Sequence, residues 1–342
     1  VSTQSTGTPD MECQFYEKLP DNRVKCTCCS HYCQISLNKT GICGVRQNID
    51  GKLILLVHSH PSAVHVDPIE KKPLFHFYPG TKIYSIGTIG CNFKCDFCQN
   101  HSLSMERIPD IEDFNLTSQT LTPQQAIDYC LKHNIPSIAF TYNEPTIFTE
   151  YALDICKLAK PHKIRCIYKS NGFMSKECAA VLKDNIQAIN IDLKAFKDST
   201  YLTLGGRLEA VLQNIKYFFE NNVVTEVTTL LIPQMNDSDE EIRQIAEFLA
   251  SVSKEIPWHI SAFHPDYKMQ DRGRTPQQTL LKALQIAKQA GLINVYLGNT
   301  NAGKENTQCE CGQLLVKRDG WAVGGVLSKC PKCSKVPYGK IE

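Results

Sequence analysis

Three cysteines stand close together in the stretch Gly90–Asn100, at Cys91, Cys95 and Cys98, with three residues and then two between them. Thiolates crowded in this way are typical of metal chemistry. A [4Fe-4S] cube takes four ligands, so three cysteines with no evident fourth would leave one iron open to an outside ligand. This stretch is therefore the first candidate for a catalytic centre.

A second cysteine group, near the C-terminus, consists of two close pairs separated by eighteen residues: Cys309 and Cys311, then Cys330 and Cys333. The second pair has the two-residue gap of a zinc ribbon, whereas the first has only one intervening residue. We expect these four thiols to hold a structural Zn²⁺. Disulfide pairing is the alternative.

A third group, near the N-terminus, has gaps of two, three and nine residues and contains Cys26, Cys29, Cys33 and Cys43. Four sulfurs at this spacing could close a zinc site or hold a second iron–sulfur cluster, which would make the protein an electron relay. Cys28 and His31 are spare candidate ligands that leave the choice open. Ordinary reduced cysteines are the remaining alternative.

The overall composition narrows the class of protein. The chain has 342 residues, 17 cysteines and a formal net charge of +2. The near-neutral balance gives no electrostatic footprint for nucleic acid or an anionic membrane. The first ten residues lack the apolar run of a signal peptide, and no run approaches the roughly 18 apolar residues of a spanning helix. We expect a cytoplasmic protein with no membrane partner.

Between residues 82 and 298 the pattern alternates between short β-rich runs and helix-period segments. The expected strands are Lys82–Ile86, Ser137–Thr141, Ile164–Tyr168, Ala188–Leu193, Val224–Ile232, His259–Phe263 and Asn294–Leu297. The expected helices are Pro123–His133, Phe148–Ala159, Lys176–Leu182, Leu208–Glu220, Asp237–Val252 and Pro276–Ala290. Thr122, Ser175 and Thr275 stand where caps would start three of these helices.

Such alternation is typical of parallel βα units. The chain is too short for eight units, so the expected α/β fold is a partial (β/α)6 TIM-type barrel at residues 81–300. A Cys-rich N-terminal extension at 1–80 and a zinc-ribbon-like segment at 301–342 would flank it. Four histidines in the extension and its junction with the barrel, His58, His60, His65 and His76, are interpreted as solvent-facing rather than as metal ligands.

Polar residues follow several of the predicted strands. Thr141–Pro145 follows the second, Lys169–Gly172 the third, and Phe263–Pro265 the sixth, while Asp192 and Lys194 lie at the end of the fourth. In folds of this class, ligands bind at the carboxyl ends of the strands. Each segment alone is ordinary turn or ion-pair chemistry. Their coincidence on one edge with the cysteine loop predicts a shared site.

The spacing Cys91-x3-Cys95-x2-Cys98, with Phe97 before the last cysteine, resembles the motif of the radical S-adenosylmethionine (SAM) superfamily. The chain is similar to its pyruvate formate-lyase activating-enzyme-like branch, and most similar to the radical SAM enzyme of the AmmeMemoRadiSam system. The resemblance also covers Asp67-Pro-Ile-Glu-Lys-Lys-Pro-Leu, Phe140-Thr-Tyr-Asn-Glu-Pro and the C-terminal cysteine pairs.

The resemblance implies that the three cysteines hold a [4Fe-4S] cluster whose fourth iron is chelated by SAM. It implies that Phe97 lies by the adenine and that Glu144 meets the methionine ammonium. The branch has Gly-Gly before that glutamate, where this chain has Tyr142-Asn143. The remaining SAM residues implied are Asn143, Ser170, Asn171, Asp192, Lys194 and His264.

The implied reaction is reductive cleavage of SAM to methionine and a 5′-deoxyadenosyl radical, which removes a hydrogen atom from an unidentified substrate: a protein that receives a glycyl radical, a small molecule or RNA. A one-electron reductant such as flavodoxin or ferredoxin, and Memo-type and AMMECR-type proteins, are the implied partners. A function of another class is a metal-binding adaptor that holds zinc and has lost catalysis.

Overall fold

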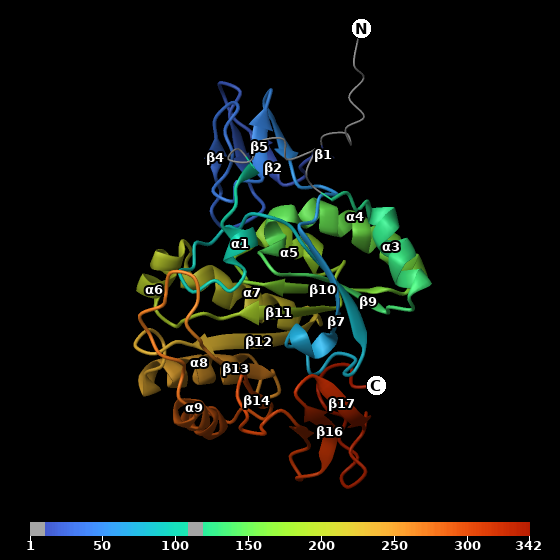
Figure 1. Ribbon diagram of the computed structural model, residues 1–342, viewed down its shortest axis with the longest axis vertical. Helices are drawn as coiled ribbons and strands as arrows, with labels where there is room; N and C mark the ends of the chain where they lie inside the picture. The colour runs from blue at the N-terminus through green and yellow to red at the C-terminus, as the bar shows by residue number, and fades with distance from the viewer. Residues whose placement is uncertain (1–10, 109–118) are drawn as a thin grey trace.

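The computed structural model describes residues 11–108 and 119–342 (Figure 1). Residues 1–10, on which part of the expected absence of a signal peptide rests, lie outside that range. An eight-stranded sheet with the strand order β14-β13-β12-β11-β10-β9-β8-β7 forms the centre of the molecule. In the described ranges, no helix is both long and apolar enough to cross a membrane.

The strands β8 to β14 are parallel neighbours that follow one another in chain order. They are β8 (Lys82–Gly87), β9 (Ser137–Phe140), β10 (Arg165–Ser170), β11 (Ala188–Asp192), β12 (Val224–Leu231), β13 (Trp258–Ala262) and β14 (Val295–Gly298). They are rich in fully buried residues, as parallel strands covered on both faces must be. The predicted strands are confirmed.

Helices connect these strands and bury their apolar faces in one continuous core with the sheet. They are α3 (Pro123–Lys132), α4 (Thr149–Ala159), α5 (Lys176–Leu182), α7 (Leu208–Glu220), α8 (Asp239–Val252) and α9 (Gln277–Gln289). All six predicted helices are confirmed. The short helices α1 (His101–Ser104) and α6 (Asp198–Leu204) were not expected. Four residues are too few to show a helical period. α6 is as long as α5 but lacks its capping side chain, because Lys197 stands at its N-cap.

Two of the three predicted helix caps are confirmed. Thr122 forms a capping box with Gln125, and the Ser175 hydroxyl accepts a hydrogen bond from the backbone N–H of Cys178. Thr275 is not a cap. Its hydroxyl donates to the carbonyl of Leu231, so a tertiary contact replaces the local one.

At its first edge the sheet gains an antiparallel strand, β7 (Ala63–Pro68), which pairs with β8 over their whole length. The mixed apolar and polar run at residues 51–67 predicts a strand pair or meander without saying which sheet it joins. A 3-10 helix, η1 (Ile69–Lys71), follows β7. The segment after it lies against the middle of the sheet, where Asn190 on β11 donates to the carbonyl of Pro73 and Glu226 on β12 accepts from the backbone N–H of Phe75. The junction therefore contributes to the central sheet as well as leading into it.

The N-terminal segment folds into two small antiparallel sheets at the top of Figure 1. One contains β1 (Met11–Glu12), β6 (Lys52–Leu55) and β5 (Arg46–Ile49); the other contains β2 (Tyr16–Lys18), β3 (Val24–Cys26) and β4 (Gln34–Ile35). Buried Arg46 binds the carboxylate of Glu150 on α4 with two N–H groups. This bidentate pair fixes the N-terminal sheets to the main body.

The C-terminal segment forms a sheet of β15 (Thr307–Gln308), β16 (Leu314–Asp319) and β17 (Ala322–Val326), here called the C-terminal module together with the rest of residues 305–342. It packs beside β7 and β14, the two outer strands of the main sheet (Figure 1). Arg318 donates to the carbonyl of Phe75 at 2.7 Å, and Lys340 donates its backbone N–H to the carbonyl of His76 at the same distance. The module is thus pinned to the segment that follows η1.

The interpretation of the four histidines as solvent-facing holds only for His65. His60 and His76 are buried, and His58 contacts Asp154 at 3.0 Å. His76 contacts the Tyr296 hydroxyl at 2.6 Å inside the protein, and burial lowers its pKa to about 4. Strand alternation could not reveal this, because most of these histidines lie outside strands.

Candidate functional site

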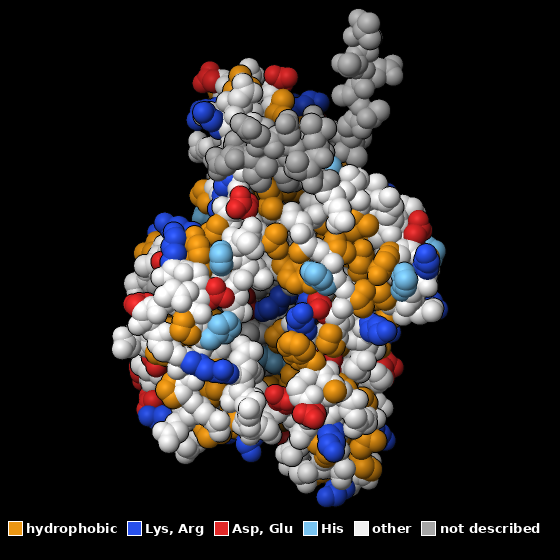
Figure 2. Space-filling view, in the orientation of Figure 1, with side chains coloured by type: hydrophobic (Ala, Val, Ile, Leu, Met, Phe, Trp, Pro, Cys, Tyr) orange, Lys and Arg blue, Asp and Glu red, His pale blue; other side chains and the backbone are white. Residues whose placement is uncertain are grey.

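A cavity of about 570 Å³ opens at the carboxyl ends of the parallel strands. Figure 2 shows the hollow near the middle of this face, with the blue of basic side chains inside it; the basic residues that line it are lysines. Its lining includes the three loop cysteines and all but one of the predicted SAM residues: Phe97, Asn143, Glu144, Ser170, Asn171, Asp192 and Lys194. The structure thus gathers strand-end side chains that are far apart in the sequence.

The cysteine loop follows β8 and enters the cavity from one end. Among the described residues that line this cavity, Cys91, Cys95 and Cys98 are the only cysteines. The donor set therefore fits a [4Fe-4S] cluster with three protein ligands and one open iron. Burial raises the pKa of the Cys95 thiol to about 11.

Gly90, directly before the loop, has a φ of +84°, and a Cβ there would meet the carbonyl oxygen of Cys43 at 2.5 Å. Only glycine satisfies both requirements. Two residues after Gly90, the backbone carbonyl of Asn92 contacts the ring of His31 at 2.8 Å. The N-terminal sheets therefore support the cysteine loop from behind.

Asn143 and Glu144 follow β9, and their side chains are largely occupied by protein groups. The Asn143 amide donates to the carbonyls of Ile89 and Gly90, at 3.2 and 2.8 Å, and so holds the start of the cysteine loop. One oxygen of Glu144 accepts from Ser170 at 2.7 Å, and the other accepts from the backbone N–H of Asn171 at 2.6 Å. Burial raises the pKa of Glu144.

Tyr142 stands at the first of the two positions before Glu144 where the resembling branch has Gly-Gly. Its φ is +73°, a conformation that glycine adopts freely and that costs other residues about 1 kcal/mol or more. The tyrosine hydroxyl donates to Asp67 at 2.9 Å. The backbone keeps the glycine conformation while the side chain gains a contact on the opposite side of the cavity.

Asn171 connects two loops of the site. Its amide nitrogen donates to the side-chain oxygen of Asn92 at 2.8 Å, and its side-chain oxygen accepts from the backbone N–H of Phe173 at 2.9 Å. The loop after β10 is thereby held against the cysteine loop. Ser170 and Asn171 lie together with Glu144, as the shared edge predicted.

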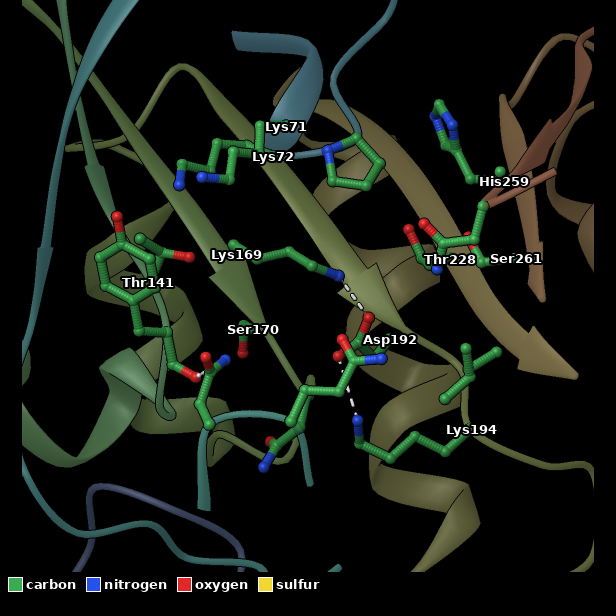
Figure 3. A pocket seen from close by; sticks show the side chains of 18 of the residues that line it. Lys71, Lys72, Thr141, Lys169, Ser170, Asp192, Lys194, Thr228, His259 and Ser261 are labelled. Carbon is green, nitrogen blue, oxygen red and sulfur yellow. Dashed lines mark hydrogen bonds and ion pairs between the residues drawn. The ribbon is translucent and has the colours of Figure 1, made fainter. Parts of the chain in front are cut away.

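Asp192 at the end of β11 binds two ammonium groups, an arrangement that we call the Asp192 triad (Figure 3). Lys194 donates to one oxygen at 3.0 Å, and Lys169 on β10 donates to the other. Burial opposes ionisation, but the two lysines hold the pKa of Asp192 at about 2. Sequence reasoning found Asp192 and Lys194 and did not single out Lys169.

A second group of the same composition, the Asp67 triad, was not assigned to the site. Asp67 on β7 accepts from Lys71 at 2.9 Å and from Lys72 at 2.7 Å. Both lysines line the cavity. In the sequence, these residues stand out only as part of the segment Asp67–Leu74 that carries the family resemblance, which does not assign them to the site.

His264 is the predicted SAM residue that does not line the cavity. Its exposed ring lies 3.3 Å from the side-chain nitrogen of Gln99, which is itself a lining residue. His264 therefore lies at the rim.

The C-terminal cysteines Cys309, Cys311, Cys330 and Cys333 bring their four sulfurs within 4.8 Å of one another. This donor set fits a tetrahedral metal ion bound at about 2.3 Å from each sulfur. All seventeen cysteines of the chain lie in the described ranges, and none forms a disulfide. The single residue between Cys309 and Cys311 did not prevent the pairs from meeting.

The N-terminal cysteines Cys26, Cys29, Cys33 and Cys43 line one small cavity. The two spare candidates also line it but bind elsewhere. Cys28 donates to the carbonyl of Thr146 at 3.0 Å, and His31 contacts the carbonyl of Asn92. Cys28 and His31 thus each have a hydrogen-bond partner on another segment of the protein.

Comparisons with known proteins agree on the central domain. A family model described as the radical SAM superfamily matches residues 85–249. The chain is 37% identical over 310 residues to an uncharacterized protein of Methanocaldococcus jannaschii, covering 90% of this chain and 91% of that one. It is 22% identical over 201 residues to the pyruvate formate-lyase-activating enzyme of Clostridium pasteurianum, covering 53% and 80%.

Among solved structures, the crystal structure of Streptococcus suis SuiB is similar, with a TM-score of 0.50 and 14% identity. The match covers 68% of this chain and 52% of the SuiB chain. At this identity the likeness concerns the fold alone.

Proposed function

The chain belongs to the radical SAM superfamily, and we propose that it binds SAM in the strand-end cavity and cleaves it reductively to start hydrogen abstraction from a substrate. The observation that carries the proposal is the convergence of three cysteines and seven predicted SAM residues on one cavity. When bound by Cys91, Cys95 and Cys98, a [4Fe-4S] cluster supplies the electron that breaks the C5′–S bond of SAM.

The protein's own task is to hold SAM in line with the open iron and to exclude water. Phe97 lies 5.9 Å from the Lys194 ammonium and offers a face for the adenine. Asp192 has two oxygens with one protein donor each, so it can still accept from a ribose hydroxyl or an ammonium. We assign the methionine ammonium to Glu144, with Ser170 and Asn171 fixing that carboxylate.

His264 and Asn143 receive different roles in this proposal. Asn143 positions the cysteine loop through its contacts with Ile89 and Gly90. His264 can approach SAM only by moving inward from the rim. We therefore expect its replacement to matter less than that of Glu144.

The decisive test replaces Cys95 by Ala in anaerobically reconstituted protein. We expect loss of the iron–sulfur absorption and of 5′-deoxyadenosine formation, because two thiolates cannot retain the cube. Cys130→Ala, a buried cysteine on α3 outside the site, is the matched control. Continued 5′-deoxyadenosine production by the Cys95 variant would refute the proposal. A zinc-binding adaptor without catalysis would show no iron and no SAM affinity in the wild type.

We further propose that the C-terminal thiols hold structural Zn²⁺ and that the N-terminal thiols hold either zinc or an auxiliary cluster. Iron and zinc per chain, measured in the wild type and in a Cys26→Ala/Cys29→Ala variant, separate the two. Loss of zinc alone would exclude an electron relay. Loss of iron, with the Cys91–Cys98 cluster still present, would support one.

The finer architecture belongs to the same proposal. We take the sheet as a partial (β/α)6 barrel at 81–300, between an extension at 1–80 and a zinc-ribbon-like segment at 301–342. The seventeen unpaired thiols fit a reducing compartment such as the cytoplasm. The nearest functional setting we propose is the AmmeMemoRadiSam system, with flavodoxin or ferredoxin as reductant and Memo-type and AMMECR-type proteins as partners.

A further inference from the structure

The wall of the cavity formed by Lys71 and Lys72 carries positive charge that the proposed SAM residues do not use. Lys71 and Lys72 lie across the cavity from Asp192 and Lys194 (Figure 3). The Lys72 side chain is only 3% exposed, whereas that of Lys71 is 42% exposed. A buried ammonium is costly unless it has a partner, so its placement in a cavity wall calls for an explanation.

The partner that these lysines share, Asp67, neutralises only one of the two charges. Lys71 and Lys72 each give one hydrogen bond to Asp67, although an ammonium group has three protons to donate. Lys72 also lies 4.7 Å from the centroid of the Tyr142 ring. The Asp67 triad therefore keeps a net positive charge and free donors.

Two carboxylates at this end make their contacts with groups other than Lys71 and Lys72. Glu70 accepts from the backbone N–H of Gly80 at 2.8 Å and lies 4.0 Å from Arg318, so its charge faces the C-terminal module. Glu305 accepts from the backbone N–H of Gly320 at 3.0 Å. Both carboxylates are held by groups outside the triad.

The C-terminal module supplies an aromatic wall next to the lysines. Trp321, in the turn between β16 and β17, is 56% exposed and lines the cavity. The Lys71 ammonium lies 5.6 Å from the centroid of the Trp321 ring. The chain's other tryptophan, Trp258, is fully buried, so exposure is a property of this position. An exposed indole in a cavity mouth offers a stacking surface.

We propose that this end binds the substrate, and that the substrate is a small molecule with a carboxylate or phosphate group and a planar ring. The anion would bind to Lys71 and Lys72, and the ring would pack on Trp321. A cavity of about 570 Å³ that also holds SAM leaves space for a small ligand rather than for a folded partner. This inference rests on the proposed function, because it takes the cavity as the SAM site.

The first test titrates reconstituted, SAM-bound protein with benzoate, phenyl phosphate and benzyl alcohol under anaerobic conditions, using calorimetry. We expect the two anions to bind more tightly than the alcohol. Lys71→Met should weaken anion binding by about tenfold or more, because a charge-assisted hydrogen bond is lost. The ratio of the dissociation constants of benzoate and phenyl phosphate shows which anion the site prefers.

Three variants make this result specific. Lys71→Arg keeps the charge and should retain most of the affinity, which also guards against a folding defect in Lys71→Met. Trp321→Ala should weaken all three ring-containing probes alike. Lys282→Met removes an exposed lysine on α9 and should change nothing. Equal binding of alcohol and anions, or wild-type affinity in Lys71→Met, would overturn the inference.

The second test asks where the abstracted hydrogen originates. An extract of deuterium-grown cells that make the protein is divided by ultrafiltration into small molecules and macromolecules. Deuterium should enter 5′-deoxyadenosine from the small-molecule fraction retained on an anion exchanger. Transfer from the macromolecular fraction would overturn the inference in favour of protein or RNA. Absence of 5′-deoxyadenosine in every arm would instead count against the proposed function.

Discussion

The Asp192 triad and the Asp67 triad have the same composition, one aspartate between two lysines, and the lysines of both line the same cavity, yet their aspartates differ. Asp192 is 29% exposed and accepts from its two lysines alone. Asp67 is 7% exposed and accepts from Lys71, Lys72, Ser85 and Tyr142. Asp192 lines the cavity, where a ligand can reach it, whereas Asp67, with its four protein donors, is not among the residues that line it.

An aspartate between two lysines thus serves two different tasks around one cavity. Asp192 can accept a further hydrogen bond from a ligand, so this triad suits direct recognition of SAM. Asp67 can only hold its donors in place, so in that triad the lysines are the groups that meet a ligand. Tyr142 connects the two sides, because it belongs to the loop of Glu144 and donates to Asp67.

Among substitutions in the two triads, Asp192→Asn should have the largest effect on SAM cleavage. An amide cannot balance Lys169 and Lys194, and the ligand would lose its anionic acceptor. A hydrogen bond to a charged acceptor is worth about 1.5–3 kcal/mol, so we expect SAM cleavage to fall by about 10- to 100-fold. Rates of 5′-deoxyadenosine formation measure this. Asp184→Asn, at an exposed ion pair, is the control; equal losses in both would remove the special role of Asp192.

Asp67→Asn should act mainly on stability. The variant leaves buried Lys72 without its charged partner, and we expect the free energy of unfolding to fall by about 3 kcal/mol. Thermal unfolding of the anaerobic protein measures the change. The fall in unfolding free energy should be smaller in Asp192→Asn, because Asp192 is the more exposed aspartate. A larger fall in Asp192→Asn would contradict the difference proposed between the two triads.

Acid should lower the stability of the protein by a smaller amount, through protonation of Asp192. The lysines hold the pKa of Asp192 at about 2, below the value of about 3.9 for an unfolded chain. The unfolded state then binds the proton first as the pH falls, so stability contributed by the pair is complete above about pH 4 and is lost toward pH 2. Acid titration of unfolding free energy should be shallower in Asp192→Asn. An unchanged slope would show that the ion pair does not contribute.

Much of the fold and part of the site could be predicted because the signals are local. The spacing of Cys91, Cys95 and Cys98 lies within eight residues, and the strand and helix periods are read within short windows. The strand-end rule then brought Glu144, Ser170 and Asp192 to one edge without any knowledge of contacts. The burial of His60 and His76 and the tertiary contact of Thr275 were missed because they depend on distant segments.

The sequence by itself determined the cysteine loop, the βα order and the edge at which polar groups collect, because each is a matter of residue type and short-range spacing. Only the tertiary structure decided the partners. Lys169 reaches Asp192 because β10 pairs with β11 in one register. Lys72, held by Asp67 of the antiparallel edge strand β7, and Trp321, from the C-terminal module, line the same cavity only in the folded chain. Such contacts join residues that no local pattern links, and burial together with charge balance selects them.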